Sequence, residues 1–216
     1  MQTTPADRNK GPILNVLKDY IKIDRKSYLL EISSGIGVHI SHFASHFPQT
    51  SFQPSEYNRE HFTRISNNIN NCASTNIYEP VFVDITTEFN TWGKTEIKLN
   101  NNDTKDFKDC VGFFDYILNI NMIHITDISA TKGLFRNASS LLKSNGLMFL
   151  YGPFAISGTI SPESNVQFNQ YLLSQNNTWG IRDTVMLEQL ASQHKMKLIN
   201  TIPMPSNNLC LIWQKK

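Results

Sequence analysis

The residues most suited to chemistry lie in the segment 28–37, whose sequence is YLLEISSGIG. An apolar run there ends in Glu31 and is followed by Gly35 and Gly37, with a helix-like pattern directly behind them. Glycines let the backbone turn tightly and approach a ligand, and the N-terminus of the following helix offers free N–H groups. A strand, a glycine-rich turn and a helix start are therefore typical of a cradle for a nucleotide cofactor. A tight turn without a ligand is the alternative for the glycines alone.

The spacing around the glycines favours one class of cofactor. The dinucleotide fingerprint G-x-G-x-x-G would require glycine at position 40, where this chain has Ile40. Glu31, four residues before Gly35, instead matches the E-x-x-x-G-x-G loop of methyltransferases that use S-adenosylmethionine (SAM). SAM has no pyrophosphate, and it carries a cationic amino-acid end that a carboxylate can hold. The cofactor residues expected in this loop are Glu31, Ser33, Gly35 and Gly37.

Three further polar side chains follow later apolar runs. Glu56 follows Gly37 at about the 20-residue interval at which an acid accepts ribose hydroxyls. Asp84 ends the next run, where an acid can accept the adenine amino group, and Asn119 would face the methionyl part of the cofactor. Because ligands of open α/β sheets bind beyond the carboxyl ends of the strands, we expect these residues at one cofactor site. A solvated acid is the alternative for Glu56, and a cap or turn residue for Asp84.

Candidates for catalysis follow the apolar run 113–120. The near-neutral pKa of an imidazole suits a general base, so His124 is the first candidate, and Asp127 the second, if an acceptor must lose a proton. Asn121 would face the cofactor and the incoming nucleophile. A structural, hydrogen-bonded histidine is the alternative for His124.

Strands and helices that could position these residues alternate along the chain. Strand-like runs are expected at 28–33, 51–53, 80–83, 113–120 and 147–151. Helical patterns cover 12–21, 38–47, 57–72, 129–142 and 184–194, the first with Pro12 at its start. This alternation predicts βαβ units and a parallel sheet with helices on both faces.

The last part of the chain extends that sheet. Segments 197–202 and 209–213 predict a terminal hairpin, and an antiparallel last strand is what the SAM-methyltransferase fold adds to a doubly wound sheet. We therefore predict an α/β, mostly parallel, seven-stranded sheet in a single domain spanning 1–216. Two segments do not fit this pattern: the Asn-rich 86–109, expected as a polar surface excursion, and 153–183, expected as an insertion on the substrate side.

Composition excludes several other classes of protein. The chain has 216 residues, 40% of them hydrophobic, and a formal net charge of +2, which is too small to argue for a nucleic-acid partner. Apolar runs are far shorter than a bilayer span, and no signal-peptide core is present, so we expect a cytoplasmic location, with the nucleus as the alternative. Three cysteines without C-x-x-C, and three histidines at 39, 42 and 46 without a carboxylate or cysteine partner, predict no metal site.

With these residues in view, the chain resembles the methyltransferase-like protein 26 family from about Arg8 to Trp213. The resemblance is carried by short blocks in order: Arg8-Asn9-Lys10, Pro12-Ile13-Leu14, Leu30-Glu31, Ser34-Gly35-x-Gly37-x-His39, Gln53-Pro54-Ser55, Ile120-Asn121-Met122-x-His124, Gly133-Leu134-Phe135, Tyr151-Gly152-Pro153, Ser164-Asn165-x-x-Phe168, Trp179-Gly180-x-Arg182-Asp183 and Pro205-x-Asn207-Asn208. The family usually has aspartate where this chain has Glu56.

The resemblance implies a Rossmann-like class I fold, SAM as cofactor with S-adenosylhomocysteine (SAH) as product, and a small-molecule or protein acceptor. Arg8 and Asn9 are expected to fold over the cofactor as an N-terminal lid. Tyr151, Asn165 and Arg182 are expected on the substrate side. Arg182 either binds an anionic group or pairs with the neighbouring acid at 183.

Methyl transfer from SAM is therefore the favoured function. Such an enzyme works chiefly by positioning and by excluding water, so strong acid and base groups are not required. A SAM-binding scaffold without catalysis is one alternative, and a nicotinamide-dependent oxidoreductase on the same sheet is the other. The residues indicate neither the acceptor nor an oligomeric state.

Overall fold

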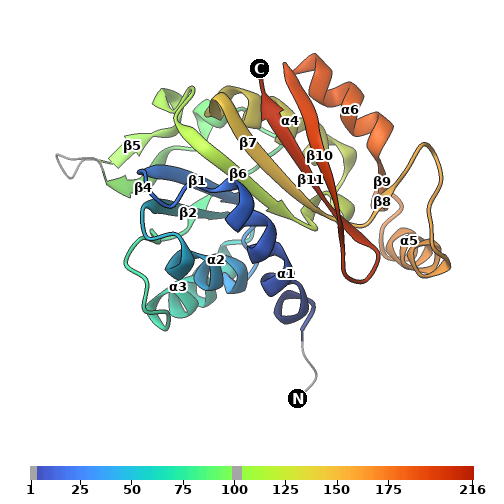
Figure 1. The fold of residues 1–216 in the computed structure, drawn as a ribbon, viewed down its shortest axis with the longest axis horizontal. Helices are drawn as coiled ribbons and strands as arrows, with labels where there is room; N and C mark the ends of the chain where they lie inside the picture. Colours follow the sequence, from blue (N-terminus) through green and yellow to red (C-terminus); the bar gives the residue numbers. More distant parts are fainter. Residues whose placement is uncertain (1–3, 99–103) are drawn as a thin grey trace.

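The computed structural model describes residues 4–98 and 104–216, whose centre is a mixed sheet (Figure 1). Within these residues the sheet has seven strands, which are, in spatial order, β10 (Met196–Met204), β11 (Asn208–Lys215), β7 (Leu142–Gly152), β6 (Phe114–Ile120), β1 (Ser27–Ile32), β2 (Thr50–Glu56) and β3 (Val81–Phe82). Pairing is parallel from β7 to β3, and β11 is antiparallel to both of its neighbours. The predicted fold class and the antiparallel last strand are confirmed.

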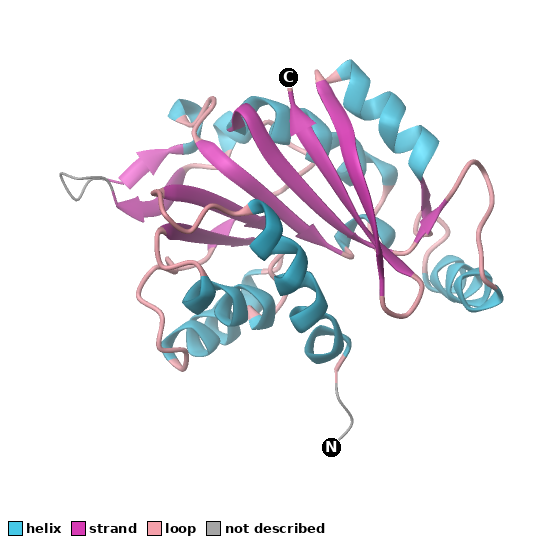
Figure 2. Cartoon of the chain, in the orientation of Figure 1, coloured by secondary structure: helices cyan, strands magenta, loops and turns pink. Residues whose placement is uncertain are grey.

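Helices cover both faces of the sheet (Figure 2). Their bounds are α1 (Pro5–Tyr20), α2 (Val38–Phe43), α3 (Phe62–Asn70), α4 (Ile128–Leu141), α5 (Glu163–Gln175) and α6 (Thr184–Gln193). Short 3₁₀ turns are η1 (Ala44–His46), η2 (Arg59–His61), η3 (Phe89–Thr91), η4 (Phe107–Asp109) and η5 (Met122–His124). The turn η5 directly follows the central strand β6.

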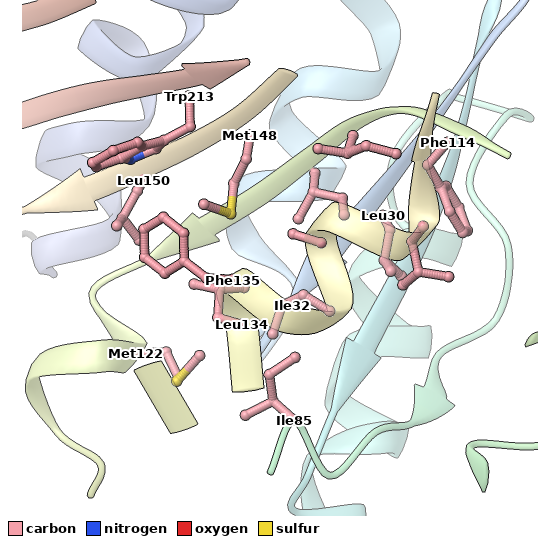
Figure 3. Close-up of a cluster of buried hydrophobic side chains, with 14 of the residues drawn as sticks. Leu30, Ile32, Ile85, Phe114, Met122, Leu134, Phe135, Met148, Leu150 and Trp213 are labelled. Atoms are coloured by element: carbon pink, nitrogen blue, oxygen red, sulfur yellow. The ribbon is translucent and has the colours of Figure 1, made fainter. Parts of the chain in front are cut away.

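Two hydrophobic cores form because successive side chains of a strand point to opposite faces. In β1, Leu30 packs into the core under α4 and α6, whereas Leu29 packs into the core under α1 and α2. Figure 3 shows the first of these cores, with Leu134 and Phe135 of α4 turned towards the strands. Phe135 meets the fully buried Trp213 edge-on, with ring centroids 5.1 Å apart. Burial on both sides holds the strand ends in fixed positions.

Helix α1 begins earlier than the predicted 12–21. Thr4 caps it: its side chain accepts from the Asp7 N–H, and the Asp7 carboxylate accepts from the Thr4 N–H, forming a capping box. Pro5 occupies the first turn, and Pro12 lies inside the helix. The prediction mistook an internal proline for the start of the helix, and Arg8 lies in the first turns of α1.

The segment 86–109 is not simply a polar surface excursion, so that prediction is wrong in part. Strands β4 (Lys94–Lys98) and β5 (Thr104–Asp106) pair as an antiparallel hairpin. Strand β4 supplies Ile97, and the flanks of the hairpin supply Trp92 and Phe107, to the core under α4. Residues 99–103, at the centre of the predicted excursion, lie outside the described residues.

The segment 153–183 contains two short strands and α5. Strands β8 (Phe154–Ala155) and β9 (Arg182–Asp183) pair in parallel as a separate two-stranded sheet, which brings the two ends of the insertion together. Asn165 of α5 donates to the carbonyl of Asn207, in the turn between β10 and β11, at 3.1 Å. In the described part of the chain, no helix has the length and apolar character needed to cross a membrane.

Candidate functional site

The two glycines after β1 have different structural roles. Both have positive φ, +60° at Gly35 and +82° at Gly37. A Cβ on Gly37 would lie 3.2 Å from Cα of Ile65, so this glycine is required by the packing of α3. A Cβ on Gly35 would meet no protein atom within 4 Å. Gly35 therefore faces open space that a ligand could fill, whereas Gly37 serves packing.

Hydrogen bonds from the neighbouring strands hold this turn in place. The Ser34 N–H donates to the Ser55 carbonyl at 2.9 Å, and the Ser55 hydroxyl donates to the Glu31 carbonyl at 2.7 Å. On the other side, the Asn119 amide donates to the Ile32 carbonyl at 3.0 Å. Oδ1 of Asn119 is buried without a hydrogen-bond partner among the described residues.

Glu56, at the end of β2, bonds directly to the glycine turn. Its Oε2 accepts the Gly35 N–H at 2.8 Å, and its Oε1 accepts the N–H groups of Tyr57 at 2.9 Å and Asn58 at 3.1 Å. Three backbone donors fix the carboxylate in one orientation. A carboxylate has about four acceptor positions, so one position remains for a ligand, on Oε2.

A cavity of about 610 Å³, which we call the first cavity, lies beyond the carboxyl ends of β1, β2, β3 and β6. Its walls include Ser33, Gly35, Glu56, Asp84 and Ile120. Among the described residues that line it, the charged side chains are carboxylates and none is lysine or arginine. The sheet thus brings together residues that the sequence predicted as cofactor ligands.

Glu31, on β1, is a buried carboxylate that is not among the residues lining this cavity. It is 2% exposed, and its Oε2 has no hydrogen-bond partner among the described residues. Burial raises the pKa of Glu31 from 4.5 to about 7, the nearby Glu56 adds to this rise, and a hydrogen bond from Ser34 opposes it. A cationic group brought close to Glu31 would favour its ionised form.

A second cavity, of about 770 Å³, lies on the other side of η5. Of the predicted residues it is lined by Arg8, Asn9, Asn121, His124, Tyr151 and Asn165. Ile120 and Met122 line the first cavity, and Ile125 lines both. The chain after β6 is therefore the wall that separates two cavities.

His124 is buried in that wall. It is 1% exposed, and neither ring nitrogen has a hydrogen-bond partner among the described residues. Burial and the charge of Arg182 lower the pKa of His124 to about 3, so the imidazole is neutral at physiological pH. A Cβ on Gly152 would lie 2.3 Å from its Nε2, which explains the glycine. A neutral imidazole can accept a hydrogen bond, but it is a weak base.

The sequence of this chain matches one known family over almost its whole length. The family model described as "Protein of unknown function (DUF938)" matches residues 1–215. The chain belongs to this family. The description of DUF938 gives no activity, so any activity must be argued from the residues of the two cavities.

Solved structures similar to this DUF938 chain share its fold. An O-methyltransferase family protein from Burkholderia thailandensis has a TM-score of 0.72 and 12% identity over 98% of this chain and 57% of its own. Human N-acetylserotonin methyltransferase, solved with SAM, has a TM-score of 0.71 and 10% identity over 97% of this chain and 53% of its own. The chain thus spans little more than half of these proteins. A putative sarcosine dimethylglycine methyltransferase from Galdieria sulphuraria, with a TM-score of 0.67 and 13% identity, is covered over 92% of its length.

Two predicted acids of the DUF938 chain organise the local backbone. Asp84 Oδ1 accepts from the N–H and the hydroxyl of Thr86, which makes it a turn residue as well as a wall of the first cavity. Asp127 caps α4 by accepting the Ser129 N–H at 2.8 Å. That backbone hydrogen bond lowers the pKa of Asp127, so the geometry argues against its predicted role as a base.

Neither predicted role of Arg182 is found. Its guanidinium donates to the carbonyls of Ile123 at 2.9 Å, Thr126 at 2.6 Å and Thr178 at 3.1 Å. It lines neither cavity, and Asp183 caps α6 instead of pairing with it. Arg182 holds the wall after β6 in position.

Arg8 and Asn9 line the second cavity and not the first, but Asn9 also contacts α2, the helix that follows the glycine turn. Oδ1 of Asn9 lies 2.7 Å from Nε2 of His39. Burial lowers the pKa of His39 to about 4, so its imidazole is neutral at physiological pH. Among the described residues, no cluster of three or more His, Cys, Asp or Glu side chains could hold a metal ion.

Sequence reasoning missed several wall residues. Trp179 and Tyr57 line the first cavity, and Phe168, Asn207 and Asn208 line the second. All of them except Tyr57 belong to the blocks that carry the family resemblance, and that was the available signal. Trp179 reaches the first cavity from the insertion, which no local pattern indicates.

Proposed function

We propose that this chain is a SAM-dependent methyltransferase of the methyltransferase-like protein 26 family, acting on a small-molecule or protein acceptor. The observation that carries the proposal is the meeting of Gly35, Glu56 and Asp84 in the wall of the first cavity. Human N-acetylserotonin methyltransferase was solved with SAM and PigF, another protein of similar fold, with SAH, which supports the same cofactor class here.

The first cavity fits a cationic nucleoside. Carboxylates are its charged groups, Gly35 leaves open space, and Glu31 has an unpartnered buried oxygen. We assign Glu56 to the ribose hydroxyls, Asp84 to the adenine amino group and Glu31 to the amino group of the methionyl end. Asn119 would contact that same end through its unpartnered Oδ1.

SAM would supply an activated methyl group, and the chain would supply position. The second cavity would hold the acceptor, with Asn121 and His124 beside its nucleophilic atom. Because His124 is neutral, it would accept a hydrogen bond from the O–H or N–H group of the acceptor. This bond would orient the lone pair of the acceptor's nucleophilic atom. Arg182 would act as a positioning residue through the carbonyls that it holds.

Calorimetric titration with SAM, SAH, NAD(H) and NADP(H) tests the proposal directly. We expect SAM and SAH to bind and the nicotinamide cofactors not to bind. Binding of NAD(H) or NADP(H) in place of SAM would favour the oxidoreductase. SAM binding without methyl transfer to any fraction of a metabolite and protein extract would favour the non-catalytic scaffold.

We also infer a cytoplasmic location. Cys72, Cys110 and Cys210 are free among the described residues, and free thiols are usual in a reducing compartment. Fractionation of cells that produce the protein with an epitope tag would test this inference.

Substitution of Glu56 by alanine is expected to weaken SAM binding by about 1–3 kcal/mol, the range of hydrogen bonds to a charged group. The measurement is calorimetry, with a thermal unfolding curve for each variant. Glu60→Ala is the matched control, because Glu60 is exposed and lines neither cavity. Equal losses in both variants would contradict the assignment of Glu56.

Affinity for SAM is expected to depend on pH through Glu31. In the free protein its pKa is about 7, so below that pH binding of a cation must release a proton. The affinity should therefore fall by about tenfold per pH unit below the raised pKa and level off above it. Calorimetric titrations in buffers of different ionisation enthalpy measure the number of protons released on SAM binding. Glu31→Gln should abolish both this release and the pH dependence of the affinity.

The same shift has a consequence for the unliganded protein. The folded pKa of Glu31, about 7, lies above the ordinary value of 4.5. Its contribution to stability is therefore complete below the ordinary pKa and is lost as the pH rises through the folded value. Thermal unfolding of wild type and Glu31→Gln across this window provides the check.

A further inference from the structure

Trp179 is a large aromatic side chain in the wall of the first cavity that belongs to neither hydrophobic core. It is partly buried, and its indole makes no hydrogen bond or aromatic ring contact with the described residues. The other two tryptophans of the chain are structural. Trp92 meets Phe107 edge-on in the core under α4, and Trp213 meets Phe135 there in the same way. Trp179 is therefore the tryptophan whose ring has a face to offer a ligand.

Hydrogen bonds hold the loop that carries Trp179 against η5. The Gly180 N–H donates to the His124 carbonyl at 2.9 Å, and the Arg182 guanidinium donates to the Thr126 carbonyl at 2.6 Å. Neither of these bonds uses the indole. The loop is therefore preformed, and a change of the Trp179 side chain would leave these bonds in place.

The contact with η5 puts Trp179 near the end of β6, where the two cavities meet. Methyl transfer from the first cavity to the second must pass the wall at η5, because Asn121 and His124 line only the second cavity. The sulfonium of bound SAM would therefore lie near η5. The adenine assigned to Asp84 would lie beyond β3, which is three strands from β6, and neighbouring strands are about 4.8 Å apart. These positions favour the sulfonium over the adenine as the partner of Trp179.

The electrostatics of the first cavity suit a cation at this place. Its charged lining consists of the carboxylates Glu56, Asp84 and Asp127, with no lysine or arginine among the described residues. The face of an indole is electron-rich and attracts a cation more strongly than the ring of tyrosine or phenylalanine does. When the methyl group leaves SAM, the electron pair of the C–S bond stays on sulfur, so SAH has no charge at this atom. An indole face beside the sulfur therefore distinguishes the methyl donor from its product.

We propose that Trp179 holds the sulfonium of SAM against its indole face and makes the first cavity bind the methyl donor more tightly than SAH. This inference rests on the proposed methyltransferase function and adds a residue of the insertion 153–183 to its cofactor site. Since the neutral sulfur of SAH gains nothing from the indole, the same contact favours release of the product after each transfer.

Calorimetry with SAM, SAH and sinefungin tests this preference for charge. Sinefungin carries an amino group, protonated at neutral pH, at the position of the sulfonium. Trp179→Leu should weaken the binding of SAM and sinefungin by about 3- to 30-fold and change the binding of SAH by less than about twofold. Trp179→Phe should keep part of the preference, because it retains an aromatic face.

Tyr171→Leu is the matched control. Tyr171 is an exposed aromatic side chain of the same insertion and lines neither cavity, so this variant should keep the wild-type ratio of SAM to SAH affinity. Tryptophan fluorescence gives a second measurement. Trp92 and Trp213 are buried, so Trp179→Phe should lose most of the change in emission that SAM causes in the wild type. Thermal unfolding confirms that each variant is folded.

Three results would overturn the inference: unchanged SAM affinity in folded Trp179→Leu, a loss of SAH affinity as large as the loss of SAM affinity, or an undiminished emission change in Trp179→Phe. Titrations of the wild type keep the two proposals apart. If the wild type binds SAM and SAH in any of these cases, the role of Trp179 is wrong and the cofactor assignment stands. If the wild type binds neither, both proposals fail.

Discussion

Replacing Gly35 by aspartate is expected to weaken SAM binding by about a hundredfold or more and to leave the protein folded. A Cβ at this position meets no protein atom within 4 Å, so the new side chain would enter the first cavity without disturbing the core. Its carboxylate would lie next to Glu56, whose Oε2 already accepts the Gly35 N–H at 2.8 Å. The added bulk would occupy the space assigned to the nucleoside. Calorimetry with SAM and SAH measures the loss.

Gly158→Asp is a closely matched control for this variant. Gly158 also has a positive φ, +81°, and open space around its Cβ position, and its N–H also donates to a carboxylate, that of Asp183. It lines neither cavity. Both substitutions therefore carry a similar backbone strain and charge penalty. The difference between their SAM affinities then measures the effect of filling the first cavity. Unchanged SAM affinity in folded Gly35→Asp would refute the site.

The residues that meet at the first cavity could be predicted from the sequence because their placement is a property of parallel sheets. Apolar runs place Glu31, Glu56 and Asp84 at the carboxyl ends of neighbouring strands, and those ends meet at one edge. The turn chemistry of Gly35 is also local, since it depends on residues within one segment. These predictions required the strand order but no contact between distant side chains.

The positions of Arg182, Arg8 and Trp179 could not be predicted in the same way. Arg182 contacts carbonyls of η5, about 60 residues earlier in the chain, and its type alone does not distinguish a carbonyl partner from an anionic ligand. Arg8 lies inside α1 because the capping box at Thr4 and Asp7 starts this helix before Pro12, and the sequence analysis did not identify that box. Trp179 reaches the first cavity only through the path of the insertion. Each of these depends on how loops pack, which hydrophobic periodicity does not encode.

Replacing Gly133 by alanine is expected to lower the free energy of unfolding by about 3 kcal/mol or more. A Cβ there would lie 2.0 Å from the Ile85 carbonyl oxygen and 2.9 Å from its carbon. Both neighbours are backbone atoms, so no rotamer change relieves the clash, and α4 must move away from the chain after β3. For a chain of this length the unfolding temperature should fall by about 6–12 °C.

The effect should also reach the first cavity, because Ile85 and Asp84 form part of its wall. Weaker SAM binding by folded Gly133→Ala is therefore expected together with the loss of stability. Gly11→Ala in α1 is the control: its Cβ meets nothing within 4 Å, and alanine is the better helix former by about 1 kcal/mol, so this variant should gain stability and bind SAM as wild type does. If Gly133→Ala unfolded at the wild-type temperature, α4 would not approach β3 as closely as described, and the position assigned to Asp84 would fail with it.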